Sequence, residues 1–317
     1  MIGILLMAYG TPASLDQVEA YYTHIRRGKP PTPELLAELI GRYEAIGGVS
    51  PLNGITYGQA DALEQALMAQ PARPGETYKV YVGMKHCAPF IGDVMDQMAQ
   101  DGFKEIICAV LAPHYSTMSV AVYMREAREA AAKWPGLNVR YVRQWHLEPA
   151  FLDALETRIA DVRTMFTDEQ RASLKMVFSA HSLPERILAA GDPYPEQLLE
   201  TSRALADRLG IRDWQFGWQS AGRTSEPWLG PDILTVLDDL GAQGYKAALS
   251  CPIGFVADHL EVLYDLDIEA TKHAHDLGMA YRRTPSLNVD PGLVEALRHA
   301  IVTCPEEVET PSEVSAR

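Results

Sequence analysis

Residues 252–269 read PIGFVADHLEVLYDLDIE, and they follow the short apolar run at 247–250. An apolar run of this length before a Pro-Ile-Gly turn predicts a buried strand, and the periodic residues after the turn predict a helix. A strand, a turn and a helix in this order are typical of α/β proteins, whose ligands bind beyond the carboxyl ends of parallel strands. The stretch therefore predicts both the fold class and the location of a site.

The predicted helix carries three carboxylates on one face. Glu261, Asp265 and Glu269 are spaced at i, i+4 and i+8, and no Lys or Arg within the segment offsets their repulsion, which is about 0.2–0.5 kcal/mol per pair. The apolar side is expected at Leu260, Leu263 and Ile268. A solvated acidic face is the simplest interpretation. Because the carboxylates follow a strand end, a track for a hard divalent cation is the alternative.

Length and composition exclude several classes of protein. The 317 residues suffice for two domains, and 47% of them are hydrophobic, an ordinary globular level. The net charge of −14 argues against nucleic acid or an anionic membrane surface as the main partner. No apolar run approaches the ~20 residues of a membrane span, and residues 1–8 lack the features of a signal peptide. A cytoplasmic protein without a membrane anchor is expected.

The cysteines are scattered. None of Cys87, Cys108, Cys251 and Cys304 forms a C-x-x-C pair. This spacing indicates reduced thiols and argues against a disulfide framework, a zinc site or an iron–sulfur cluster.

Eight short apolar runs alternate with amphipathic stretches along the chain, which predicts parallel α/β organisation. The runs lie at 3–8, 79–83, 106–111 and 138–142 in the first half, and at 175–179, 215–218, 246–250 and 279–282 in the second. Four strands in each half predict two Rossmann-like doubly wound domains, 1–145 and 146–304, each with a four-stranded parallel sheet. A last helix near Pro291–Val302 is expected to pack back on the first domain, and the polar tail 305–317 to be mobile.

Polar and aromatic residues gather after the predicted strands, so the two sheets should enclose an interdomain cleft lined with His, Tyr, Trp and Ser. His181 follows the apolar run 176–180, and its imidazole suits proton transfer and borderline metals such as Fe²⁺. A structural, hydrogen-bonded histidine is the alternative. Glu261 would complete a pair of base and carboxylate. His86, His114 and His259 are weaker candidates, each more simply explained as structural.

A basic segment marks the first domain. Residues 21–29 read YYTHIRRGK, so Arg26 and Arg27 stand beside two tyrosines at the expected end of a helix. Cations there stabilise the helix dipole, but they would also hold the carboxylates of an aromatic ligand. Arg42 belongs to the same candidate wall.

Several motifs resemble those of the ferrochelatases, in the same order and over nearly the whole chain. They are LLMAYGTP at 5–12, the segments 21–28 and 42–51, LAPHYSTMS at 111–119, SAHSLPE at 179–185, the segments 218–220 and 228–231, and the stretch 252–269. SAHSLP and DHLEVLYDLDIE are very specific. Tyr9 in the opening motif is similar to the soluble, monomeric coproporphyrin III ferrochelatases. The chain lacks the membrane-docking lip, the cysteine cluster and the hydrophobic C-terminal extension of other members.

The resemblance implies chelatase-like insertion of Fe²⁺ into coproporphyrin III, giving coproheme in haem biosynthesis. It implies His181 and Glu261 as catalytic, metal-binding residues facing the pyrrole nitrogens, and Tyr9 on the opposite face as a ligand of iron in the product. Asp265 and Glu269 would hold or relay a hydrated cation, or bind Mg²⁺. The implied porphyrin contacts are Tyr9, Arg26, Arg27, Arg42, Ser50, Tyr123 and Trp228.

Further expectations follow from the same resemblance. Fe²⁺ is a substrate and no cofactor is required. The protein should be monomeric, with only transient contacts to neighbouring haem-pathway enzymes. The side from which iron enters stays open. A protoporphyrin IX ferrochelatase, a cobalt chelatase and a non-catalytic tetrapyrrole-binding protein are the alternatives. No G-x-G-x-x-G follows a strand, which argues against a nucleotide-dependent oxidoreductase.

Overall fold

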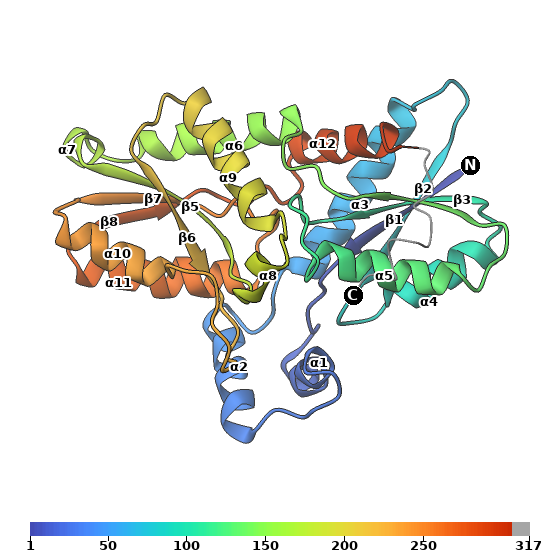
Figure 1. The fold of residues 1–317 in the computed structure, drawn as a ribbon, viewed down its shortest axis with the longest axis horizontal. Helices are drawn as coiled ribbons and strands as arrows, with labels where there is room; N and C mark the ends of the chain where they lie inside the picture. The colour runs from blue at the N-terminus through green and yellow to red at the C-terminus, as the bar shows by residue number, and fades with distance from the viewer. Residues whose placement is uncertain (306–317) are drawn as a thin grey trace.

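Two four-stranded parallel sheets lie side by side in the computed structural model, which describes residues 1–305 (Figure 1). The first contains β1 (Ile2–Ala8), β2 (Tyr78–Met84), β3 (Glu105–Val110) and β4 (Asn138–Val142). The second contains β5 (Leu174–His181), β6 (Trp214–Gln219), β7 (Ala247–Cys251) and β8 (Ala280–Arg283). All eight predicted strands are confirmed, with ends shifted by at most two residues. Residues 306–317 of the predicted tail lie outside the described residues.

Both sheets have the same topology. Their strand orders are β2-β1-β3-β4 and β6-β5-β7-β8, and every neighbouring pair is parallel. In each sheet the second strand lies on one side of the first strand and the third strand on the other. Doubly wound sheets bind ligands at this switch point, between the first and third strands. The predicted fold class is therefore confirmed, and the matching orders are what a duplicated half would give. The division near residue 146 stays a prediction.

Helices cover both faces of each sheet. The longer helices are α3 (Leu52–Ala69), α4 (Ile91–Gln100), α5 (Val120–Ala131), α6 (Pro149–Thr164), α9 (Tyr194–Arg208), α10 (Ile233–Ala242) and α12 (Pro291–Val302). The short ones are η1 (Leu15–Gln17), α7 (Asp168–Ala172), α8 (Arg186–Ala189) and α11 (Thr271–Asp276). All seven residues of β1 are buried, as expected for a strand enclosed on both sides. No helix of the described chain is long and apolar enough to cross a membrane.

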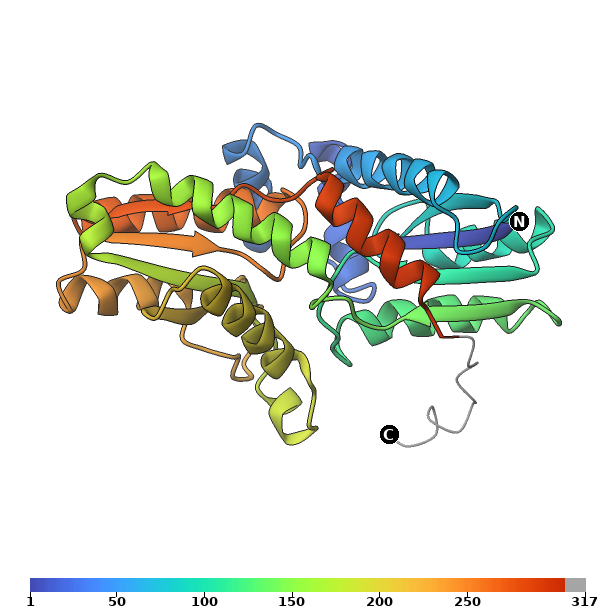
Figure 2. The ribbon, with the colours of Figure 1, turned by 90° about the horizontal axis from the view of Figure 1, so that it is seen from above.

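One hydrophobic core runs through both halves. Leu63 of α3, Phe151 of α6, Leu198 of α9 and Leu297 of α12 belong to a single buried cluster that reaches strands of both sheets. Figure 2 shows α6 along the second sheet and α12 along the first, and the two helices contact each other. The last helix, α12, contacts α3 of the first half as well as α6. The two halves are thus joined by apolar packing as well as by the chain.

Two helices of the first half lie apart from its sheet, across the gap between the halves (Figure 1). They are α1 (Val18–Ile25) and α2 (Pro33–Ala45). The side chain of Thr32 caps α2 by accepting a hydrogen bond from the Leu35 amide at 3.4 Å, and Pro33 begins the helix. Val18 and Tyr43 pack on Leu260 of the second half. The first half therefore covers the start of the acidic helix.

The acidic helix differs from the predicted pattern. After Leu260 and Glu261, residues Val262–Ala270 form a π-helix, η2. Its buried side chains include Val262, Leu266 and Ala270, spaced by four. Ile268, predicted on the apolar side, is exposed, whereas Leu260 is buried. A π-helix closes its hydrogen bonds over five residues instead of four, so more residues fit into each turn and the buried face shifts.

Candidate active site

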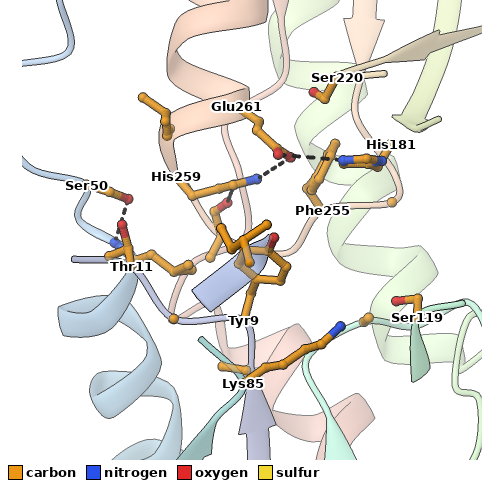
Figure 3. Close-up of a pocket in the computed structure, with 18 of the residues that line it drawn as sticks. Tyr9, Thr11, Ser50, Lys85, Ser119, His181, Ser220, Phe255, His259 and Glu261 are labelled. Atoms are coloured by element: carbon orange, nitrogen blue, oxygen red, sulfur yellow. Dashed lines mark hydrogen bonds and ion pairs between the residues drawn. The ribbon is translucent and has the colours of Figure 1, made fainter. Parts of the chain in front are cut away.

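A cavity of about 580 Å³ lies between the halves, as the sequence predicts. Its walls include Tyr9, which follows β1, Lys85, which follows β2, and Leu111, which follows β3. The other half contributes His181 at the end of β5 and Phe255 in the turn after β7 (Figure 3). The volume is within the usual range of small-molecule sites. The cleft thus joins the ligand-binding ends of both sheets.

His181 and Glu261 face each other across the second sheet's switch point. The Nε2 atom of His181 lies 3.6 Å from Oε1 of Glu261 (Figure 3). The Nδ1 atom of His181 contacts the main-chain oxygen of Ser182. Because a carbonyl oxygen only accepts hydrogen bonds, Nδ1 must be the protonated nitrogen, and Nε2 carries the lone pair whenever the ring is neutral.

His259 makes a second, similar contact with Glu261. Its Nδ1–H donates to the main-chain oxygen of Ala257 at 2.9 Å, and its Nε2 lies 3.5 Å from Oε2 of Glu261. Two imidazoles therefore flank one carboxylate, each offering Nε2. Sequence analysis ranked His259 among weaker candidates. Its position two residues before Glu261 was a signal, but the carbonyl contact that aims its ring was not visible in the sequence.

Burial is the largest single effect on the pKa of His181 and of Glu261 and disfavours both charged forms, yet the polar contacts of each group together outweigh it. The Glu261 carboxylate raises the pKa of His181 against the effect of burial. Against the same effect, His181 and then His259 hold the pKa of Glu261 well below its usual range. The contact between the imidazole and the carboxylate thus favours the charged form of each group. A proton taken up by His181 is therefore stabilised by the Glu261 carboxylate.

Asp265 lies one helical turn after Glu261, and its buried carboxylate already has two polar partners. Its two oxygens contact Arg42 of the first half and the Ser220 hydroxyl, and the Arg42 guanidinium lies 4.5 Å from the ring centre of Tyr264. Burial and the Glu261 charge raise the pKa of Asp265 to about 6, although Arg42 opposes this shift. Arg42 offsets the shift only in part, because its own side chain is partly exposed to solvent. Glu269 is exposed. The three carboxylates thus extend from the cleft through a buried contact to solvent.

The opposite wall of the cleft is aromatic and basic. The Tyr9 side chain is 41% exposed, and its ring centre lies 4.5 Å from that of His86. Burial of the hydroxyl end and the Glu261 charge raise the pKa of Tyr9. The Lys85 ammonium lies 5.1 Å from the ring centre of Tyr123, and burial lowers the pKa of Lys85. Sequence analysis assigned no role to Lys85.

The predicted porphyrin contacts divide into two groups. Tyr9, Arg42, Ser50, Tyr123 and Trp228 all line the cleft. The remaining two, Arg26 and Arg27, lie just beyond its lining, after residues Tyr22 and Ile25 that do belong to it.

The two arginines outside the lining have different surroundings. The Arg26 guanidinium lies 5.6 Å from the ring centre of Tyr22, and its Nε donates to the main-chain oxygen of Lys29 at 3.3 Å. Arg27 is exposed and has φ of 56°. Both cations therefore follow the lining residue Ile25 in sequence without belonging to the lining themselves.

No three His, Cys, Asp or Glu side chains among residues 1–305 are arranged to hold a metal ion by themselves. His181 and Glu261 supply one nitrogen and one carboxylate beside the cavity. An ion handled there would take its other ligands from a molecule bound in the cleft. The geometry therefore suits transfer of a metal ion to a bound ligand better than permanent storage.

Comparison with known proteins agrees with this geometry. The ferrochelatase family model matches residues 1–303. The coproporphyrin III ferrochelatase of Bacillus subtilis (strain 168) is 45% identical over 302 residues, covering 95% of this chain and 97% of the relative. That of Halalkalibacterium halodurans (strain C-125) is 46% identical over 301 residues, covering 95% and 96%.

Solved structures show the same architecture at low sequence identity. SirB from Bacillus subtilis with Fe³⁺ has a TM-score of 0.59 at 12% identity, covering 95% of this chain and 94% of that one. The sirohydrochlorin chelatase SirB from Bacillus subtilis subspecies spizizenii in complex with cobalt has a TM-score of 0.57, also at 12% identity, covering 95% and 93%. Likeness at this level shows the fold alone. The match over residues 1–303 and the 45–46% identities go further, and by them this chain belongs to the ferrochelatase family.

Proposed function

We propose that this protein inserts Fe²⁺ into coproporphyrin III and releases coproheme. The observation that carries the proposal is the cluster of His181, Glu261 and His259 on one wall of a cavity of about 580 Å³. Relatives at 44–46% identity that are named coproporphyrin III ferrochelatases support the choice of porphyrin.

The chemistry accounts for these residue types. A free-base porphyrin carries two pyrrole N–H groups, so each Fe²⁺ that enters the ring displaces two protons. A neutral His181 would accept one of these protons at Nε2, the atom that faces Glu261, and His259 would offer its Nε2 to the second. The carboxylate between them would stabilise the imidazolium that forms. Imidazole nitrogen and carboxylate oxygen also suit Fe²⁺ as ligands. His181 and Glu261 would thus bring metal binding and proton removal to one point.

The acidic residues of η2 supply a route for the cation in this proposal. Glu269 is exposed and would meet the hydrated ion first. Asp265 would follow, and the ion would there displace Arg42 from the carboxylate. Two carboxylates one turn apart would also accept Mg²⁺, which prefers oxygen ligands. On this route iron would reach the ring from the His181 side.

The opposite wall would hold the ring. Tyr9 would face the metal from the other side and ligate iron in the product, and its raised pKa keeps the hydroxyl protonated until a metal ion binds. The cleft is lined by Arg42, Ser50, Tyr123 and Trp228. Arg26 and Arg27, directly after the lining residue Ile25, would bind carboxylates that extend beyond the lining. In a chain of net charge −14, such local cations are what an anionic ligand requires.

The test is an anaerobic mixture of purified protein, Fe²⁺ and free-base coproporphyrin III. We expect the Soret and visible bands to change to those of the metallated ring, faster than without protein. No change above the uncatalysed rate would overturn the proposed function. Ni²⁺ or Co²⁺ in place of Fe²⁺ would show whether another metal is preferred.

A further inference from the structure

A buried carboxylate joins the two walls of the cleft. Asp192 precedes α9 in the second half and is 8% exposed. Its Oδ2 accepts hydrogen bonds from the Ser116 hydroxyl at 3.0 Å, the Thr117 amide at 2.7 Å and the Thr117 hydroxyl at 2.6 Å. These donors belong to the loop after β3, in the first half. A buried carboxylate is tolerated only with such partners, so the contact depends on both halves.

Tyr194 extends this connection to His181. The Tyr194 amide donates to Oδ1 of Asp192 at 3.0 Å, and its buried hydroxyl donates to the main-chain oxygen of His181 at 3.1 Å. The next residue, Ser182, accepts the Nδ1–H of His181 through its own main-chain oxygen. The direction of the imidazole therefore depends on where the backbone at 181 and 182 lies. An unbroken series of hydrogen bonds links the loop of the first half to this backbone.

The same loop forms part of the cleft wall opposite His181. Met118 and Ser119 directly follow the residues that bind Asp192, and both line the cavity. Two more side chains of α9 hold this loop. Oε1 of Gln197 accepts from the Tyr115 amide at 2.7 Å, and the Thr201 hydroxyl lies 2.9 Å from Nε2 of His114. Positions 197 and 201 share one helix face, so a single face of α9 contacts the opposing wall.

We propose that Asp192 and Tyr194 are positioning residues for metal insertion, which set the separation between His181 and the wall at Met118 and Ser119. This inference rests on the proposed function. A rigid flat ligand between two walls reacts only if the accepting nitrogen stands at the right height above it, and small displacements of a reacting group lower rates strongly. Asp192 accepts hydrogen bonds from the wall at Ser116 and Thr117, and Tyr194 donates one to the main chain of His181. Tyr194 also lines the cavity, but its hydroxyl is already bonded to the His181 main-chain oxygen, so both residues would act through others.

The two residues have different expected phenotypes. Tyr194→Phe removes one oxygen and leaves Asp192 in place, so we expect kcat for coproporphyrin III to fall about tenfold and KM to change less than twofold. Asp192→Asn puts an amide N–H where three donors converge, so we expect KM to rise at least tenfold because the wall moves. Ser202→Ala is the matched control. Its buried hydroxyl donates to the Leu198 carbonyl at 2.8 Å within α9, and we expect no change in kcat or KM.

A second measurement does not depend on turnover. The pKa of the His181 imidazole, followed by NMR and assigned with His181→Ala, reports its distance from Glu261. We expect Tyr194→Phe to lower this pKa and Ser202→Ala to leave it unchanged. Wild-type protein that inserts no iron would refute the proposed function, while the NMR titration would still decide on the position of His181. Tyr194→Phe protein with wild-type kcat and wild-type His181 pKa would overturn the inference, even if its thermal stability were lower.

Discussion

His181 and Glu261 form a pair in which each partner sets the protonation state of the other. Their 3.6 Å separation and the raised pKa of His181 mean that the ring holds a proton over part of the neutral range. Only the neutral ring can accept a proton from a porphyrin. Activity should therefore be lost as the pH falls through the raised pKa of His181.

Replacement of His181 by alanine should remove the proton acceptor and a metal ligand together. We expect metal insertion to fall at least a hundredfold, since general-base catalysis contributes about 10²–10⁴. Porphyrin binding, measured by fluorescence quenching, should survive because the cleft walls remain. His299→Ala, a change at an exposed histidine of α12, serves as the control. Near-wild-type turnover in His181→Ala would remove His181 from the mechanism.

Glu261→Gln keeps the shape of the side chain but removes its charge. Because Glu261 raises the pKa of His181, the variant should have a lower His181 pKa. The acid limb of kcat/KM should then move to lower pH, while the maximum falls almost as far as in His181→Ala. Glu200→Gln is the control, because Glu200 bonds His146 at 2.9 Å outside the cleft. An acid limb at unchanged pH would show that the pair is not coupled.

The acidic π-helix η2 shows what the sequence could and could not predict about an element. The helix and its three carboxylates were predicted, because charged residues at a spacing of four are visible in any helix. The π geometry was not, since residues that alternate every four positions fit both helix types. As a result Ile268 was placed on the wrong side. The contact of Asp265 with Arg42, 223 residues away in sequence, was only one of several pairings the sequence allowed.

Changes within η2 should affect iron more than the porphyrin. For Asp265→Asn and Glu269→Gln we expect KM for Fe²⁺ to rise severalfold and kcat to fall less. Because the pKa of Asp265 is raised to about 6, its carboxylate is charged only above that pH. KM for iron should therefore decrease as the pH rises through about 6, and this decrease should disappear in Asp265→Asn. Asp276→Asn, an exposed change in α11, is the control. A larger effect on kcat than on KM would exclude the delivery route.

At the scale of the molecule, the joint between the halves contains two buried neutral histidines. His114 and His146 are each 2% exposed, with ring centres 5.3 Å apart. Burial lowers the pKa of both, more strongly for His114. Above about pH 6.5 these two imidazoles are neutral in the folded chain and in the unfolded chain. Below it, the unfolded chain takes up protons that the folded one does not, so the free energy of unfolding should decrease.

This acid sensitivity can be measured by urea unfolding at pH 8 and pH 5.5. His146→Gln keeps a donor for Glu200 but cannot titrate, so its midpoint should fall less between the two pH values than that of the wild type. His275→Gln, at a histidine with a 90% exposed side chain, should behave as the wild type does. An equal fall in His146→Gln and wild type would show that this histidine does not carry the effect.

The arrangement of the whole molecule was largely predictable, because each strand is a short apolar run and most strands are followed by polar or aromatic residues. The two parallel sheets and the cleft between them followed from that pattern. The joint did not, since Asp192 with Ser116, and Gln197 with Tyr115, are pairs separated by more than 70 residues. The residues around each member of these pairs do not indicate which distant residue it contacts.

The choice of porphyrin depends on charge across the whole cleft. Coproporphyrin III carries four propionates, while protoporphyrin IX carries two and exposes two vinyl groups. Each charge-assisted contact is worth roughly 1.5–3 kcal/mol, so two lost contacts correspond to about a hundredfold or more in kcat/KM. We expect Arg26→Ala and high salt both to weaken the preference for coproporphyrin III. If neither Arg26→Ala nor high salt changed the preference, the propionates would not be bound by Arg26.

The most direct test is the ratio of kcat/KM for coproporphyrin III and protoporphyrin IX, measured with Fe²⁺ under anaerobic conditions in the same detergent. We predict that the wild-type protein inserts iron into both rings faster than the uncatalysed reaction, and that coproporphyrin III is favoured about a hundredfold. Equal values of kcat/KM would contradict coproporphyrin III as the substrate, and the absence of insertion into either ring would contradict the chelatase itself.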